Sequence, residues 1–156
     1  MKQLYALLLC CSLSLCVFDL HAQTIAVKAG HVIKPATGEV LDQQILLIKD
    51  GLITGIQEAS EPFTADTLID LSDSWLSPGL MDCHVHLNGI GDGRAGDELT
   101  LLPDEVLTLQ AARNARTHLY SGVTTVRDCG AKNRTSFMLR QAMEMGITPG
   151  PMLVLA

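Results

Sequence analysis

Aromatic residues and positive charge are both scarce in this sequence. Aromatic residues make up 4% of the 156 residues, the formal net charge is −6, and the isoelectric point lies near 5.2. A protein that binds a phosphate backbone needs a basic surface, and one that binds single strands stacks bases on aromatic rings. The composition therefore argues against nucleic acid as a partner. With 47% hydrophobic and 18% charged residues, it is typical of a globular protein.

Cysteine is sparse once the N-terminal segment is set aside. Of the five cysteines, Cys10, Cys11 and Cys16 lie in that segment, which leaves Cys83 and Cys129. We expect these two to be buried free thiols on neighbouring strands, because a disulfide has narrow geometric requirements. No Cys-x-x-Cys pair and no Gly-x-Ser-x-Gly motif is present, so the sequence offers neither a cysteine zinc or redox pair nor the nucleophile of α/β-hydrolases.

The first 22 residues predict a secretory signal peptide. Lys2 supplies a positive start, and Leu4 to Phe18 form an apolar core that is short for a membrane span. We expect cleavage after Ala22 and an exported protein, periplasmic or extracellular, without a membrane partner after cleavage. Leu20 is larger than the residue usually found at its position, which leaves the cleaved bond open. A lipid anchor at Cys16 and a buried N-terminal helix are less favoured alternatives.

Residues 23–77 show the pattern of short strands joined by turns. Gln44 to Gln57 predicts a hairpin around Asp50-Gly51, a dipeptide suited to a type I′ turn because both central residues need a positive φ. Pro35 to Gly38 predicts another turn, and Thr67 to Leu71 another strand. On its own, this segment predicts a short antiparallel sheet.

Strands and helices alternate from Leu80 onward. Apolar stretches predict a strand that begins at Leu80 and further strands at Val123–Asp128 and at Met152–Leu155. Stretches of helical period predict two helices between them, Asp104–Tyr120 and Thr135–Met145. Such alternation is typical of a parallel sheet with right-handed crossovers. The buried face of the first helix is predicted to contain Val106, Leu109, Ala112, Ala115 and Leu119.

Two histidines stand two positions apart in the first of these strands. Side chains alternate along a strand, so His84 and His86 share a face with Asp82, and their Cα atoms lie about 6.5–7 Å apart. Each imidazole can then place a nitrogen about 2.0–2.1 Å from one zinc ion. The opposite face is apolar and consists of Met81, Cys83, Val85 and Leu87. His84 and His86 are therefore candidate metal ligands; the alternative is a pair of hydrogen-bonded histidines on a half-exposed strand.

Three stretches of the sequence resemble the amidohydrolase superfamily. Pro78 to His86 is similar to its signature Pro-Gly-x-x-Asp-x-His-x-His at the end of the first barrel strand. Gly122 to Gly130 resembles the second strand of the imidazolonepropionase- and prolidase-like branch, and Gly150 to Ala156 resembles the start of the third strand. The resemblance implies an α/β fold in which residues 23–77 form a small β-sandwich segment and residues 78–156 form the first three strands of a TIM (β/α)8 barrel.

A complete barrel of this kind needs about 250 residues. We therefore expect the chain to be the N-terminal portion of a larger enzyme, with an open strand edge at Met152–Leu155. The resemblance implies further ligands on later strands: a carboxylated lysine and two histidines, together with an aspartate base. No catalytic residue is assigned within the 156 residues.

The resemblance also implies a metal-dependent hydrolase of C–N bonds in amides, cyclic amides or dipeptides. It implies one or two divalent metal ions, zinc above all, and a small-molecule or peptide substrate; oligomerisation stays open. Zinc polarises a carbonyl group and lowers the pKa of its bound water to about 7. Two alternatives remain, a deaminase of the same superfamily and a catalytically inert truncated chain.

Other candidate sites carry weaker patterns. Gly91 to Gly96 matches the Gly-x-Gly-x-x-Gly of dinucleotide sites, but a proline separates it from the next helix and its acidic residues disfavour a pyrophosphate. We expect a mobile loop over the metal site there instead. Arg127 and Asp128 end the second strand, where substrate contact, an ion pair and a helix cap are equally open. His31 and His118 are expected in solvent.

Overall fold

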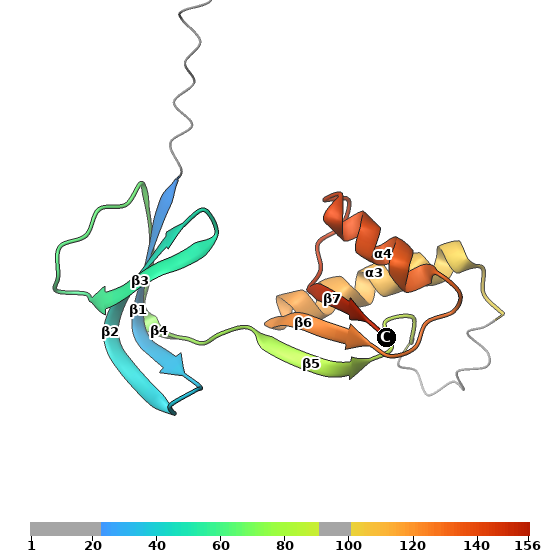
Figure 1. Cartoon of the computed structure of the whole chain (residues 1–156), viewed down its shortest axis with the longest axis horizontal. Helices are drawn as coiled ribbons and strands as arrows, with labels where there is room; N and C mark the ends of the chain where they lie inside the picture. Colours follow the sequence, from blue (N-terminus) through green and yellow to red (C-terminus); the bar gives the residue numbers. More distant parts are fainter. Residues whose placement is uncertain (1–22, 91–100) are drawn as a thin grey trace, which may run out of the picture. The chain divides into compact units, whose positions relative to one another are not determined.

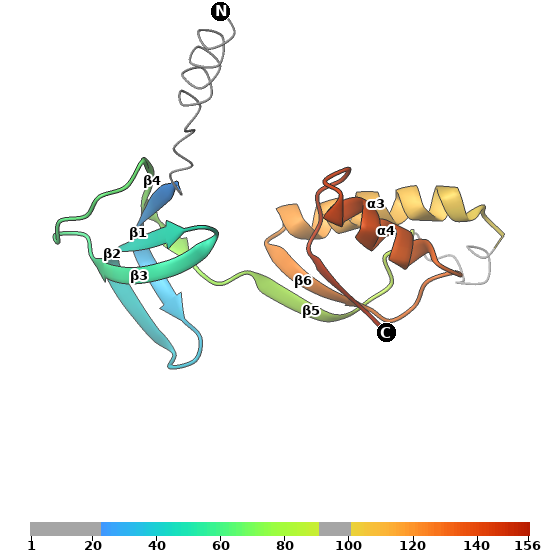
Figure 2. The ribbon, with the colours of Figure 1, turned by 45° about the horizontal axis from the view of Figure 1, so that its top comes forward.

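A computed structural model describes residues 23–90 and 101–156 of the chain (Figures 1 and 2). The chain divides into two compact units, and the boundary between them in the sequence lies between Ser77 and Pro78. The predicted signal peptide and the glycine-rich segment 91–96 lie outside the described residues. Within the described ranges, the helices fall short of the length and apolarity that crossing a membrane requires.

The first unit is a four-stranded mixed sheet with the strand order β3-β2-β1-β4. The strands are β1 (Thr24–Lys34), β2 (Glu39–Lys49), β3 (Leu52–Glu58) and β4 (Thr67–Leu76). The predicted hairpin is present between β2 and β3, and Asp50 and Gly51 have φ values of 52° and 75°, as a type I′ turn requires. The second predicted turn lies between β1 and β2, where the Gly38 N–H donates to the Lys34 carbonyl at 2.9 Å.

The prediction of a purely antiparallel sheet is wrong for β4, which pairs with β1 in parallel. A tight turn joins only antiparallel neighbours, whereas residues 59–66 form a connection long enough to return the chain beside β1. Two hydrogen bonds fix the arrival point: the Asp66 N–H donates to the Thr24 carbonyl at 2.9 Å, and the Thr24 N–H donates to Asp66 Oδ2 at 2.7 Å. The core of this unit contains Val27, Ala29, Val32 and Leu46.

The second unit is a three-stranded parallel sheet, in the order β5-β6-β7, with two helices on one face (Figures 1 and 2). Its elements are β5 (Leu80–Val85), α3 (Asp104–Tyr120), β6 (Val123–Asp128), α4 (Thr135–Glu144) and β7 (Met152–Leu155). The predicted alternation is confirmed, and the fold is α/β. Buried contacts between the helices and the sheet come from Val85, Leu87, Ala111, Ala115, Val126, Leu139 and Leu153.

The predicted buried face of α3 is confirmed at Ala115 and wrong at Val106 and Leu109. Leu107, Ala111 and Ala115 are buried, whereas Val106 and Leu109 are 46% and 72% exposed. Both stripes have helical spacing, so periodicity alone does not choose between them. The face that packs on the core is the one with Leu107, Ala111 and Ala115.

The apolar face of β5 is buried only at its C-terminal end. Val85 and Leu87 lie in the core, but Met81 is 74% exposed and Cys83 is exposed as well. The helices pack beside β6 and β7, where α3 contacts β6 and α4 contacts β7, which leaves the start of β5 uncovered. Cys83 and Cys129 are free thiols as predicted, but the prediction that both are buried is wrong: Cys129 is only half-buried.

Candidate metal centre at the end of strand β5

The imidazoles of His84 and His86 lie side by side at the C-terminal end of β5. His84 belongs to the strand, and His86 follows it directly. The two rings are nearly parallel, with an interplanar angle of 6° and centroids 5.3 Å apart, and their Nε2 atoms are separated by 3.2 Å. The alternation of side chains along the strand therefore brings both rings to one face, with converging nitrogens, as the sequence predicts.

The distance between the two Nε2 atoms suits a shared metal ion. Two nitrogens about 2.0–2.1 Å from one tetrahedral zinc ion lie about 3.3–3.4 Å apart. The observed 3.2 Å is close to that separation, and it also permits one N–H···N hydrogen bond between neutral rings. The imidazole pair thus fits two positions of a metal site.

Further ligands are not found near the two histidines in the described part of the chain. Across residues 23–90 and 101–156, no group of three or more His, Cys, Asp or Glu side chains is placed to hold a metal ion. Asp82, which the sequence places on the histidine face, has one carboxylate oxygen that accepts the His84 backbone N–H at 3.0 Å. His84 and His86 therefore provide two ligand positions, and a structural or catalytic zinc site needs three or four from protein.

A turn after His86 is tied to both helices through asparagine side chains. The Gly89 N–H donates to the His86 carbonyl at 2.9 Å. From α3, the Asn114 amide donates to the carbonyls of Leu87 and Gly89 at 2.8 and 2.6 Å. These contacts fix the backbone from which the second histidine projects.

Asn88 is the buried centre of this turn. Its amide nitrogen donates to the Leu107 carbonyl at 3.0 Å, and its Oδ1 accepts the Thr135 hydroxyl at 2.9 Å and the Lys132 N–H at 3.3 Å. With 6% exposure, the side chain spans from β5 to α3 and to the start of α4. Sequence reasoning missed Asn88 and Asn114, because their partners lie 19 to 47 residues away along the chain.

The start of α3 is also bonded to the loop between β6 and α4. Lys132 forms an ion pair with Asp104 at 3.2 Å, and the Asn133 amide donates to the same carboxylate. Hydrogen bonds from Asn133 and then Lys132 hold the pKa of Asp104 below its ordinary value. The loop before α4 is therefore attached to the start of α3.

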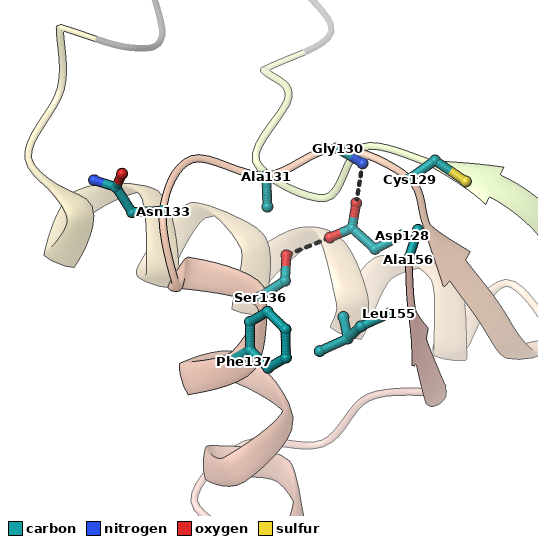
Figure 3. Close-up of a pocket in the computed structure, with 9 residues that line it drawn as sticks. All are labelled: Asp128, Cys129, Gly130, Ala131, Asn133, Ser136, Phe137, Leu155 and Ala156. Carbon is teal, nitrogen blue, oxygen red and sulfur yellow. Dashed lines mark hydrogen bonds between the residues drawn. The ribbon is translucent and has the colours of Figure 1, made fainter.

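Asp128 at the end of β6 is bonded inside the unit and is 4% exposed. Its carboxylate accepts the Ser136 hydroxyl from the first turn of α4 and the Gly130 N–H at 3.3 Å (Figure 3). The bond to Ser136 joins two side chains, and α4 has no side-chain hydrogen bond at its N-terminal cap, so the helix-cap role proposed for Asp128 is not found. Arg127 is exposed beside it.

The two other histidines of the described residues are partly exposed, and each also contacts a neighbouring group. His31 contacts the Asp42 carboxylate at 2.7 Å and lies against Trp75, with ring centroids 4.3 Å apart. His118 lies 3.0 Å from the Asn114 carbonyl one turn earlier on α3. Neither lies in a group of metal-binding side chains within the described part of the chain.

Comparison with known proteins extends these observations. Residues 75–156 match the amidohydrolase family model, which is more than half of the 156 residues. An adenine deaminase from Listeria monocytogenes is 33% identical over 85 residues, which cover 54% of this chain and 14% of that protein. An imidazolonepropionase from Pseudomonas entomophila is 37% identical over 60 residues, covering 37% of this chain and 15% of that protein.

The structure is also similar to a solved one. A crystal structure of a Xaa-Pro dipeptidase, with methionine in its active site, has a TM-score of 0.72 and 27% identity, and the match covers 85% of this chain and 33% of the dipeptidase. The chain therefore spans about a seventh of the two curated relatives and a third of this structure. The family match confirms the resemblance seen in the sequence: the chain belongs to the amidohydrolase family.

Proposed function

We propose that this chain supplies the first part of a metal-dependent hydrolase that cleaves C–N bonds in amides, cyclic amides or dipeptides. The observation that carries the proposal is the 3.2 Å separation of the His84 and His86 Nε2 atoms at the C-terminal end of a parallel strand. In barrel enzymes the active site lies at that end of the strands. Relatives that act on C–N bonds of small molecules or peptides support the same class of substrate.

In this proposal, residues 78–156 contribute three strands of a TIM (β/α)8 barrel and residues 23–77 contribute part of a small β-sandwich. The parallel order β5-β6-β7 with helices on one face supports the first assignment. The coverage of one third of the dipeptidase structure supports the view that further strands complete the site.

The full site would hold one or two divalent ions, zinc in this proposal, and the two histidines would bind one ion. When bound, such an ion polarises the scissile carbonyl and lowers the pKa of its water to about 7. Both rings must offer a lone pair at Nε2, so each carries its proton at Nδ1. The turn bonded to Asn114 keeps the backbone of His86 in place, and this leaves only side-chain rotations for alignment.

Metal analysis of two protein forms tests the proposal. The protein expressed from its full reading frame should carry stoichiometric zinc and hydrolyse members of a dipeptide and lactam panel. Residues 23–156 alone should show neither, because two ligands hold zinc poorly where four are usual. A long form without metal contradicts the hydrolase assignment; a soluble, monomeric short form that holds zinc and turns over contradicts the view that further strands are needed.

A deaminase is the second candidate, and the match to an adenine deaminase favours it. Both reactions use a metal-bound water, but a deaminase attacks a ring carbon and releases ammonia. Ammonia release from adenine and related bases by the metal-loaded full-length protein, without turnover of the dipeptide and lactam panel, would assign the chain to the deaminases.

Export is a separate proposal that concerns the N-terminus. The apolar stretch Leu4 to Phe18 followed by a polar exit and Ala22 predicts a mature protein that begins near Gln23. Intact-mass measurement of the protein from the periplasm or medium should give this N-terminus. Recovery of a mature chain that still carries residues 1–18 contradicts the proposal.

A further inference from the structure

We propose that Gly130 is a positioning residue for the His86 imidazole, because the lack of a side chain at the end of β6 leaves the space that the ring occupies. The inference rests on the proposed role of His86 as a metal ligand. It concerns a residue that follows the neighbouring strand β6, 44 positions away along the chain.

The contact between the glycine and the ring is close. A Cβ atom added at Gly130 would lie 2.8 Å from Cε1, 2.9 Å from Nδ1 and 3.3 Å from Nε2 of His86. Real Cβ atoms essentially never come within 3.0 Å of such neighbours, so a methyl group and the ring cannot share this space. Gly130 is not among the described glycines with a positive φ, which means that the ring, and not the backbone conformation, demands a glycine here.

The backbone at Gly130 has little freedom to move away from the ring. One residue earlier, the Cys129 N–H donates to the Val85 carbonyl at 2.9 Å, which extends the β5–β6 pairing past the end of the strands. The Gly130 N–H donates to Asp128 at 3.3 Å, and the same carboxylate accepts the Ser136 hydroxyl (Figure 3). Because Asp128 is 4% exposed, it anchors the turn to β6 and α4 from inside the unit.

A methyl group at this position has different consequences with and without metal. In the metal-free protein the exposed His86 ring can rotate about its side-chain torsions to another staggered position at small cost. In the metal-bound protein that rotation removes Nε2 from its place 3.2 Å from the His84 Nε2. A positioning role therefore predicts a loss of metal affinity with little loss of folding stability, whereas a packing role predicts the reverse.

The test uses Gly130→Ala in the protein expressed from its full reading frame. Metal affinity is measured by chelator competition with zinc and by titration with Co²⁺, and stability by thermal unfolding of the metal-free protein. We expect an affinity loss of about 10-fold or more, as for other changes that misalign a ligand, a changed Co²⁺ absorption spectrum, and an unfolding temperature within about 2 °C of the wild type.

Gly150→Ala is the matched control in the same unit. Its methyl group would lie 2.2 Å from the Met143 sulfur and 3.3 Å from the Ala115 Cβ, so it is crowded too, but no histidine is among these neighbours. Metal affinity should be unchanged in this variant. A loss equal to that of Gly130→Ala would show that crowding in the unit, not displacement of His86, weakens metal binding.

A double-mutant cycle with His86→Ala separates the inference from the proposed function. If Gly130 acts through His86, adding Gly130→Ala to His86→Ala changes Co²⁺ affinity less than about 2-fold, because interacting sites are not additive. An equal loss in both backgrounds overturns the inference. If His86→Ala weakens metal binding and Gly130→Ala does not, the inference alone fails. If His86→Ala leaves affinity unchanged, the proposed metal role fails and the inference with it.

Discussion

Replacement of His84 by alanine is expected to lower zinc affinity by more than 100-fold and to remove turnover by the full-length protein. Loss of a hydrogen-bond partner of a metal ligand already costs about 10–100-fold in affinity or activity, and loss of the ligand itself should cost more. His84 is exposed at the end of β5, so the substitution should change the free energy of unfolding by no more than about 0.5 kcal/mol. Metal content by elemental analysis measures the loss of bound zinc, and the denaturant midpoint of the metal-free protein measures the change in stability.

The matched control for this substitution is His31→Ala. That imidazole lies in the first unit, paired with Asp42 and tilted against the Trp75 ring, and it has no part in the proposed metal centre. Zinc content and turnover should therefore stay at the wild-type level. Stoichiometric zinc in His84→Ala would mean that the 3.2 Å contact is an imidazole–imidazole hydrogen bond rather than half of a metal site.

Features of local origin could be predicted from the sequence. Asp50-Gly51 forms the expected turn because positive φ is a property of those two residues, and Gly122 and Gly146, with φ of 88° and 70°, stand where α3 and α4 end. The convergence of His84 and His86 follows from the two-residue period of a strand. Each of these inferences needs only a few consecutive residues.

Features that depend on a distant partner could not be predicted. The parallel pairing of β4 with β1 depends on where residues 59–66 deliver the chain, which no local pattern encodes. The buried face of α3 depends on which of two equally periodic stripes fits the neighbouring elements, and Leu107 with its two alanines fits. The exposure of the first residues of β5 depends on which strands the two helices cover, and they cover β6 and β7.

The residues that hold the candidate site in place also depend on partners far away in the sequence. Asn88 meets Lys132 and Thr135 across 44 and 47 positions, and Gly130 lies against a ring on the neighbouring strand. An asparagine in a loop and a glycine after a strand are ordinary turn residues when only the sequence is known. Their role is visible only once β5, β6 and α4 are placed together.

Asn88→Ala is expected to destabilise the protein by about 2–3 kcal/mol, because a buried donor or acceptor left without its partner costs about 1–3 kcal/mol. The substitution removes the acceptor of the Lys132 N–H. It also removes the side-chain N–H that donates a hydrogen bond to the Leu107 carbonyl. The Thr135 hydroxyl is less affected, because it also donates to the Lys132 carbonyl at 2.8 Å. Urea unfolding of the metal-free full-length protein measures the change.

Two further variants separate hydrogen bonding from lost volume. Gln57→Ala removes an amide that also bonds two backbone carbonyls, at Glu61 and Pro62, but these bonds are exposed to water, and its cost should stay below about 0.5 kcal/mol.

Asn88→Asp keeps the size of the side chain and turns a donor into a buried carboxylate oxygen facing the Leu107 carbonyl. If the polar contacts hold the turn, the aspartate variant at neutral pH is at least as unstable as the alanine variant. If only the filled space matters, it is nearly as stable as the wild type. Because the turn carries the backbone next to His86, the first result would also mean that the metal ligand depends on a buried asparagine that never touches the metal.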